Sequence, residues 1–386
     1  MFSEVSTLRR TGAIPTSPTG MGTTSIRALR RRQPDPFRDN PFKAGPSALA
    51  PSSSITLPHF DIPIPARSNP HRAYAEKQNM TWLRDHGMVT SPEAEHAYTD
   101  WEVGRHGADC WPEATPNDLA LATDMLAFFF LFDDQFDTLQ VRDIGQAGSV
   151  CKNLIAIAHQ APTAQPDSPV THAFEDLVRR GRQNMSTLWV SRTAGDWERY
   201  FAAYPHEQIR RHEQQIPALD DYLTIRRGCA GTEVVADMIE RLNRVQLPVI
   251  AFHSPHLRLM RQIASDVPFI CNDVYSYEKE HARGEVYNMV AVLVKQNRYS
   301  LQDAIDEIQR IVEGQISRFL ALRDELPQLF EDLHLSETEQ QHVIRYVTGL
   351  GDWLRGHNDW MSTTSRYHPT GTPSATTDGF AEELLK

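Results

Sequence analysis

Residues 127–137 read AFFFLFDDQFD, an aromatic and aliphatic run that ends in three carboxylates. On one helix, Asp133 and Asp137 stand four residues apart and share a face, while Asp134 lies about a third of a turn away. Hard divalent cations such as Mg²⁺ bind oxygen ligands of this kind and share their remaining positions with water and phosphate. A solvated acidic helix end explains this stretch equally well when it is taken alone, because short acidic patterns are common.

The composition argues against several classes of protein. The chain has 386 residues and a formal net charge of −11, and no basic face that nucleic-acid binding requires is evident. Its four cysteines have no CxxC spacing, so they indicate neither a zinc site nor a disulfide framework. No apolar stretch follows the N-terminal arginines, and the longest apolar run, residues 125–132, is too short to span a bilayer. We expect a soluble cytoplasmic protein without a nucleic-acid partner or stable membrane insertion; its helical faces leave room for a homodimer.

The pattern of apolar residues divides the chain into three parts. Residues 1–57 are rich in Ser, Thr, Pro, Gly and Arg and have no sustained period, so we expect a disordered extension. From residue 58, apolar positions recur at helical spacing and alternating strand patterns are missing. We therefore predict one all-α domain over residues 58–368, followed by a tail over residues 369–386. The expected helices are 70–87, 91–106, 116–137, 142–160, 168–190, 193–214, 218–229, 232–253, 256–281, 285–296, 300–325 and 336–364.

A second polar constellation lies in residues 269–283, FICNDVYSYEKEHAR. Asn272, Ser276 and Glu280 recur at i, i+4 and i+8, so a helix aligns them as a ladder of three oxygen ligands. This mixture of amide, hydroxyl and carboxylate suits Mg²⁺, with water and phosphate completing the coordination.

Three further residues of this stretch fit the same chemistry. Asp273 can orient the ligands from behind. Lys279 and Arg283 follow at i and i+4 and supply cations for phosphate oxygens. Alone, the stretch could be the polar face of an ordinary helix. Paired with an aromatic-backed acidic motif in an all-α chain, it favours a metal-assisted phosphate site.

Together the motifs resemble those of the microbial class I terpene synthases, also called terpene cyclases. The family's aspartate-rich motif matches residues 133–137, and its second metal motif, NDxxSxxKE, matches residues 272–280 without departure. The family's diphosphate-sensing arginine precedes the second motif by some four dozen residues. Arg226 stands 46 residues before Asn272, and Arg227 is the neighbouring candidate. The other matches are Gly228 and Gly231 for a helix break after the arginine, the pair Arg366-Tyr367 near the end of the domain, and Asn69, Pro70 and Trp82 upstream.

The resemblance implies a single-domain α-bundle around an apolar cavity, and a carbon–oxygen lyase that ionises a linear isoprenyl diphosphate and cyclises the carbocation. Farnesyl diphosphate, giving a sesquiterpene hydrocarbon or alcohol, is the expected substrate, and geranyl or geranylgeranyl diphosphate is the alternative. Three Mg²⁺ ions per active site are implied, with Mn²⁺ as a substitute. The implied metal ligands are Asp133, Asp137, Asn272, Ser276 and Glu280. The implied diphosphate contacts are Arg226, Lys279, Arg283, Arg366 and Tyr367.

The carbocation needs a dry cavity with aromatic faces, because aromatic rings attract cations through their quadrupole. Phe129 and Phe130 lie one turn before Asp133 and can face such a cavity, and Trp353 on the last expected helix is a further candidate. Simple core packing is the competing explanation for each ring. Asp134 is expected to pair with basic residues when the site closes.

Three other functions fit parts of the sequence. A chain-elongating prenyl diphosphate synthase shares the helical fold but uses two aspartate-rich motifs. A di-metal carboxylate protein needs two Glu-x-x-His pairs, and residues 93–96, 278–281 and 331–334 have that spacing. A non-catalytic isoprenoid-binding protein has no reason to keep every predicted metal ligand.

Overall fold

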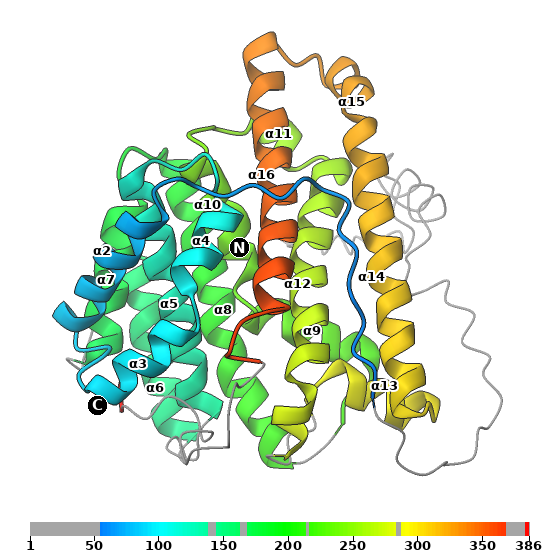
Figure 1. Ribbon diagram of the computed structural model, residues 1–386. Coiled ribbons are helices and arrows are strands. Elements are labelled where there is room, and N and C mark those ends of the chain that lie inside the picture. Colours follow the sequence, from blue (N-terminus) through cyan, green and yellow to red (C-terminus); the bar gives the residue numbers. More distant parts are fainter. Residues whose placement is uncertain are drawn as a thin grey trace, which may run out of the picture. The chain divides into compact units, whose positions relative to one another are not determined.

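The computed structural model describes residues 55–137, 144–162, 168–213, 216–282, 287–367 and 383–385. Within these ranges every regular element is a helix and no strand occurs, which confirms the all-α prediction (Figure 1). The helices are α2 (Arg72–Asp85), α3 (Pro92–Asp100), α4 (Val103–Cys110), α5 (Pro116–Asp137), α6 (Ile144–Ala158), α7 (Pro169–Gly181), α8 (Thr187–Glu213), α9 (Leu219–Cys229), α10 (Thr232–Leu242), α11 (Val249–Phe252), α12 (Pro255–Ala282), α13 (Met289–Asn297), α14 (Leu301–Asp324), α15 (Leu326–Asp332) and α16 (Glu337–Met361).

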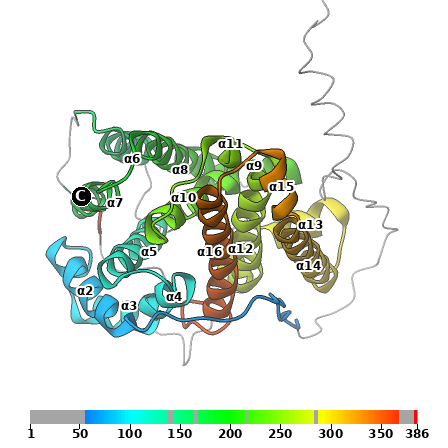
Figure 2. The same cartoon turned by 90° about the horizontal axis from the view of Figure 1, so that it is seen from above.

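Helix α5 carries the aromatic run and is buried on every side, which is what its nearly continuous apolar sequence requires. It starts at Pro116, where a proline costs no helical hydrogen bond. Phe128, Leu131 and Phe132 are fully buried. The helix packs against α2, α4, α7 and α10. Helix α16 lies between α4 and α12, with α14 outside α12 (Figure 2).

The observed helix boundaries differ from the predicted ones at three breaks. The helix expected at 91–106 is divided into α3 and α4 by Glu102, whose φ of 54° is left-handed. The helix expected at 232–253 is divided by a connection that contains Pro248, a residue unable to continue the helical hydrogen bonds. The break expected near residue 191 lies instead at residues 182–186, so Trp189 belongs to α8. The short helix α15 was not predicted.

The segment before α2 is extended and ties the two ends of the domain together. It rises beside α14 and crosses α16 (Figure 1). Phe60 and Ile62 are buried, and Arg355 of α16 donates hydrogen bonds of 3.0 Å to the carbonyl oxygens of Ile62 and Ile64. Asn69 donates to the carbonyl oxygen of Trp111 at 2.9 Å. Asn69, one of the upstream residues that match the family, therefore fixes the turn between α4 and α5.

The two predicted flanking segments fall mostly outside the described residues. Within them, the structure describes residues 55–57 and 383–385. Glu383–Leu385 packs on the domain: Leu384 and Leu385 are buried, and the Leu384 amide donates a 2.9 Å hydrogen bond to the side-chain oxygen of Gln135. None of the helices in the described ranges has the length and apolar character that a bilayer crossing requires.

Candidate active site

One cavity of about 680 Å³, its open mouth included, lies where helices α4, α5, α8, α9, α10, α12 and α16 meet. Its wall is aromatic and aliphatic over most of its area, and charged and amide side chains gather at one end. The lining residues at this polar end are Asp133, Arg226, Asn272, Arg366 and Tyr367. Residues from both acidic motifs therefore reach a single cavity.

Asp133 is held by a hydrogen-bonded pair of tyrosines from α8. Tyr204 donates to a carboxylate oxygen of Asp133 at 3.0 Å, and the hydroxyl oxygens of Tyr204 and Tyr200 lie 2.8 Å apart. Burial and the nearby carboxylate raise the pKa of both phenols, so they remain protonated. These tyrosines are not among the site residues predicted from the sequence, although their i, i+4 spacing places them on one face of a helix.

Asp134, in contrast, forms a buried ion pair with Arg366. The guanidinium donates two parallel hydrogen bonds of 2.8 and 2.9 Å to the carboxylate. The guanidinium carbon of Arg366 also lies 4.9 Å from the centre of the Phe130 ring and 4.5 Å from that of Trp101. The diphosphate contact expected of Arg366 stays a prediction. The structure shows its ion pair with Asp134, a residue that was expected to pair with basic residues when the site closes.

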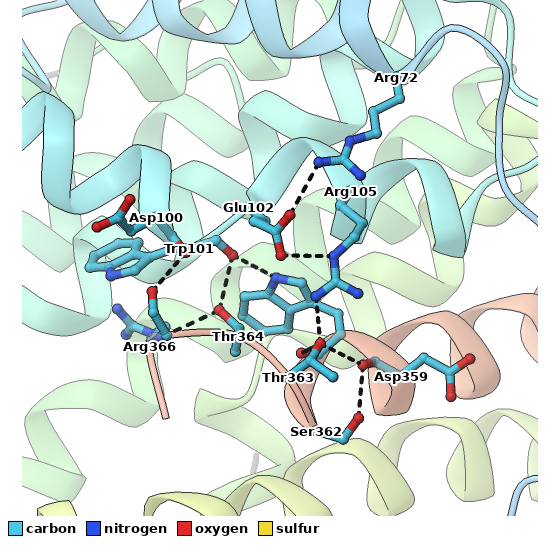
Figure 3. Close-up of polar contacts among 12 residues, drawn as sticks. Arg72, Asp100, Trp101, Glu102, Arg105, Asp359, Ser362, Thr363, Thr364 and Arg366 are labelled. Carbon is cyan, nitrogen blue, oxygen red and sulfur yellow. Dashed lines mark hydrogen bonds and ion pairs between the residues drawn. The ribbon is translucent and has the colours of Figure 1, made fainter. Parts of the chain in front are cut away.

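The segment after α16 is anchored on the corner between α3 and α4, and this anchoring fixes Arg366 (Figure 3). Thr364 donates a 3.0 Å hydrogen bond to the carbonyl oxygen of Trp101, and Arg105 donates one of 2.7 Å to the hydroxyl of Thr363. The corner exposes its carbonyl groups because the left-handed residue 102 interrupts the helix there. A break that the sequence did not reveal therefore positions a predicted site residue.

Arg226 joins the second motif on the opposite side of the polar end. Its guanidinium donates to the side-chain oxygen of Asn272 at 3.2 Å and to Asp273 at 3.0 Å. Burial raises the pKa of Asp273 to about 6, although the charge of Arg226 opposes the rise. Asn272 in turn donates a 2.7 Å hydrogen bond to the hydroxyl of Tyr367. Arg366 and Tyr367, adjacent in sequence, thus contact one acidic motif each.

Arg227 points elsewhere, which separates it from Arg226. It donates two hydrogen bonds, of 2.8 and 2.7 Å, to the buried carboxylate of Asp266, and it does not line the cavity. The helix break predicted after these arginines is present at Gly231, which lies between α9 and α10 with a φ of 68°. A Cβ atom there would approach the Phe129 ring to 2.7 Å, so glycine allows the backbone to pack on a cavity ring.

The rest of the second motif continues along α12 beyond the cavity lining. Ser276 donates to the backbone oxygen of Asn272 at 2.8 Å, and Glu280 accepts a 2.9 Å hydrogen bond from Asn288. Lys279 is half-buried. Two predicted residues are not placed: Arg283 lies outside the described residues, and the side chain of Asp137 is not described.

The oxygen ligands fit a hard divalent cation. Asn272, Ser276 and Glu280 share one face of α12, and each offers an oxygen with unused lone pairs. Among the described residues no group of three or more His, Cys, Asp or Glu side chains could hold a metal ion. A di-metal carboxylate centre needs Glu-x-x-His pairs that project into the core of a bundle. All six residues of the three pairs at 93–96, 278–281 and 331–334 are solvent-exposed, so the described residues do not support such a centre.

Phe129, Phe130 and Trp353 all line the cavity. Two histidines that are not among the predicted site residues line the cavity as well. His106 of α4 and His357 of α16 share a hydrogen bond of 2.8 Å between ring nitrogens. Only their shared surroundings in three dimensions identify them, since each is a single histidine on an apolar helix face.

Comparisons with known proteins agree with this geometry. A family model described as terpene synthase family 2, C-terminal metal binding, matches residues 124–318, which contain both acidic motifs. The chain is 33% identical over 332 residues to a (−)-beta-caryophyllene synthase of Saccharothrix espanaensis, covering 84% of this chain and 93% of the relative. It is 32% identical over 327 residues to pentalenene synthase of Streptomyces avermitilis, covering 84% and 97%. The solved structure of germacradien-4-ol synthase from Streptomyces citricolor matches with a TM-score of 0.73 and 35% identity, covering 79% of this chain and 98% of that one.

Proposed function

Because the chain belongs to the bacterial class I terpene synthases, we propose that it ionises farnesyl diphosphate with the help of Mg²⁺ and cyclises the resulting cation to a sesquiterpene. The main observation in support of this proposal is the polar end of the cavity, where Arg366 pairs with Asp134 and Tyr367 pairs with Asn272. The choice of a C15 substrate is supported by the caryophyllene synthase relative, whose name describes it as farnesyl-diphosphate-cyclizing.

In this proposal the polar end binds the diphosphate and its metal ions. Asp133 and Asp137 belong to one metal-binding group, and the oxygen ladder of Asn272, Ser276 and Glu280 forms the other. Bound divalent ions act as Lewis acids on the leaving oxygen, without proton transfer. The number of ions, three, follows from the family resemblance.

In this proposal, cationic side chains and one tyrosine hydroxyl hold the diphosphate as its charge grows. Arg226, Arg366 and Tyr367 are donors at the polar end, and Lys279 and Arg283 follow on the second motif. Interactions that strengthen as the allylic C–O bond breaks lower the barrier, whereas those equally strong with bound substrate do not. An acidic protein can thereby bind an anionic substrate.

The aromatic wall serves the second half of the reaction. The faces of Phe129, Phe130 and Trp353 stabilise a positive charge by up to about 2 kcal/mol each when water is excluded. An enclosed apolar surface also keeps bulk water from the cation. The conformation of the substrate's isoprenyl chain inside the cavity then determines how the ring closes.

The test incubates the purified protein separately with geranyl, farnesyl and geranylgeranyl diphosphate, with Mg²⁺ or with EDTA, and analyses volatile products by gas chromatography and mass spectrometry. We expect a cyclic C15 product that EDTA abolishes. Asp133→Asn and Asn272→Ala should each lower turnover about 100-fold or more while the circular dichroism spectrum is retained. Unchanged substrates with a folded protein would refute catalysis and leave isoprenoid binding.

A further inference from the structure

The histidine pair places polar nitrogen atoms in a part of the cavity wall where the neighbouring rings are those of Phe130, Trp353 and Trp360. His106 is fully buried, and its Nδ1 has no hydrogen-bond partner. Its Nε2 is bonded to Nδ1 of His357. Nε2 of His357 has no hydrogen-bond partner among the described residues. Buried polar atoms without partners are rare in folded proteins and indicate an unseen water molecule or a functional role.

The neighbouring side chains cannot provide the missing partner. His106 stacks on Trp360 at 4.2 Å between ring centres, and the ring of Trp353 lies 4.6 Å from that of His357. Both indole N–H groups are already used: Trp353 donates to the carbonyl oxygen of Ala264 and Trp360 to that of Trp101. The other close ring, Phe130, has no polar atom.

Both imidazoles are neutral, because burial lowers the pKa of His106 well below its usual value and that of His357 to about 3. A neutral imidazole has one N–H group and one bare nitrogen. If Nδ1 of His357 donates the shared hydrogen bond, Nε2 of His357 is a bare acceptor. If His106 donates it, Nε2 of His357 carries the N–H group and is a donor. A hydrocarbon chain in the cavity satisfies neither, whereas a water molecule satisfies both.

We propose that the His106–His357 pair holds one water molecule in the cavity and that this water ends the cation cascade, so that the main product is an alcohol. The inference rests on the proposed cyclase function and deepens it. A lone pair of the water oxygen forms the new C–O bond to the cationic carbon. The oxonium then loses one proton to the bare Nε2 of His357, whose Nδ1–H is donated to His106. The product is neutral, and the imidazolium releases its proton when the cavity opens.

The first experiment uses the unmodified protein. The full chain is incubated with Mg²⁺ and each of the three isoprenyl diphosphates in buffer made with H₂¹⁸O, and products are analysed by mass spectrometry. We expect the main product to be an alcohol whose mass increases by one ¹⁸O label. Turnover to hydrocarbons alone would overturn the water site while leaving the cyclase function intact. Absence of any turnover would refute the proposed function, and this inference with it.

A set of variants then assigns the water to the pair. His357→Leu removes the polar atom, and we expect the ratio of alcohol to hydrocarbon to fall about tenfold. His357→Gln retains a polar end and should restore part of the alcohol. The matched control, Trp353→Phe, changes the same wall without removing that nitrogen, so the carbon skeletons should shift while the alcohol share stays close to that of the parent. An unchanged alcohol ratio in folded His357→Leu would overturn the assignment.

Discussion

Asp133 and Asp134 are adjacent, yet their side chains have different surroundings. Asp133 accepts a hydrogen bond from Tyr204 at the cavity, whereas Asp134 is buried against Arg366. We predict that Asp134→Asn lowers the free energy of unfolding by about 3 kcal/mol, because it leaves the arginine charge buried and unpaired. Asp133→Asn should lower turnover about 100-fold or more with a much smaller loss of stability. Urea unfolding and product assays separate the two; equal stability losses would contradict this division.

Gly231 is a residue at which the backbone, and not a side chain, shapes the cavity. We predict that Gly231→Ala destabilises the protein by about 1–2 kcal/mol, because φ is 68° and the new methyl would collide with the Phe129 ring. Displacement of that ring should also change the product mixture. The control is Gly314→Ala on α14, where the added Cβ meets nothing within 4 Å and helix propensity should stabilise slightly. Identical melting temperatures for the two variants would contradict the strain argument.

The neutral histidines should make stability depend on pH in one direction. The unfolded chain protonates His357 near pH 6.5, but in the fold burial lowers its pKa to about 3. The contribution is therefore intact above pH 6.5 and is lost progressively as the pH falls below it. We expect a loss of about 1 kcal/mol between pH 6.5 and 5.5 from this residue. Urea unfolding of the parent and of His357→Leu at both pH values isolates the contribution of His357 to the free energy of unfolding. If this free energy falls equally with pH in both proteins, the burial effect is contradicted.

At the scale of elements, the end of α5 is held by two separate parts of the chain that follows α16. Arg366 binds Asp134, and Leu384 binds the next residue, Gln135. We predict that ending the chain after residue 382 lowers stability by about 3 kcal/mol, through the loss of two buried leucines, and raises the Mg²⁺ concentration needed for half-maximal turnover.

The control for this deletion ends the chain after residue 385, which retains the contact. Thermal unfolding and Mg²⁺ titration of product formation compare the two shortened proteins. If both need the same Mg²⁺ concentration, the segment does not support the metal-binding end of α5.

Element boundaries show where local sequence was a sufficient guide. Ser300 and Ser336, the first residues of the helices expected at 300–325 and 336–364, cap α14 and α16, because a serine side chain satisfies the free amide groups of the first turn. The break at Glu102 was missed because the left-handed residue itself is neither glycine nor asparagine. The carbonyl oxygen of the preceding residue, Trp101, accepts a hydrogen bond from Thr364 in the segment after α16, more than 250 residues away in sequence.

For the whole molecule, ligand binding should couple the two motifs to global stability. We expect Mg²⁺ together with inorganic pyrophosphate to raise the melting temperature by about 5 °C at saturating concentration, since a ligand that binds only the folded state stabilises it. Either component alone should give a smaller shift. Differential scanning calorimetry measures it, with Asn272→Ala as the comparison; an equal shift in that variant would exclude Asn272 from the binding site.

The sequence by itself determined the all-α class and the two acidic motifs, because these depend on helical periodicity and on short spacings along one helix. The arginine–tyrosine pair was found through the family resemblance. Periodicity also placed Phe129 and Phe130 one turn from Asp133. Only the tertiary structure decided that Arg226 and not Arg227 faces the cavity, since neighbouring residues on a helix point about 100° apart.

The tertiary structure alone also brought together the tyrosine pair behind Asp133 and the histidine pair in the cavity wall. The two tyrosines of α8 meet Asp133 of α5, and the two histidines come from α4 and α16, elements that are distant along the chain. Single polar residues on apolar helix faces have no local signature. Their chemistry depends on which partners the packing of helices places within hydrogen-bonding distance, and on how completely that packing excludes water.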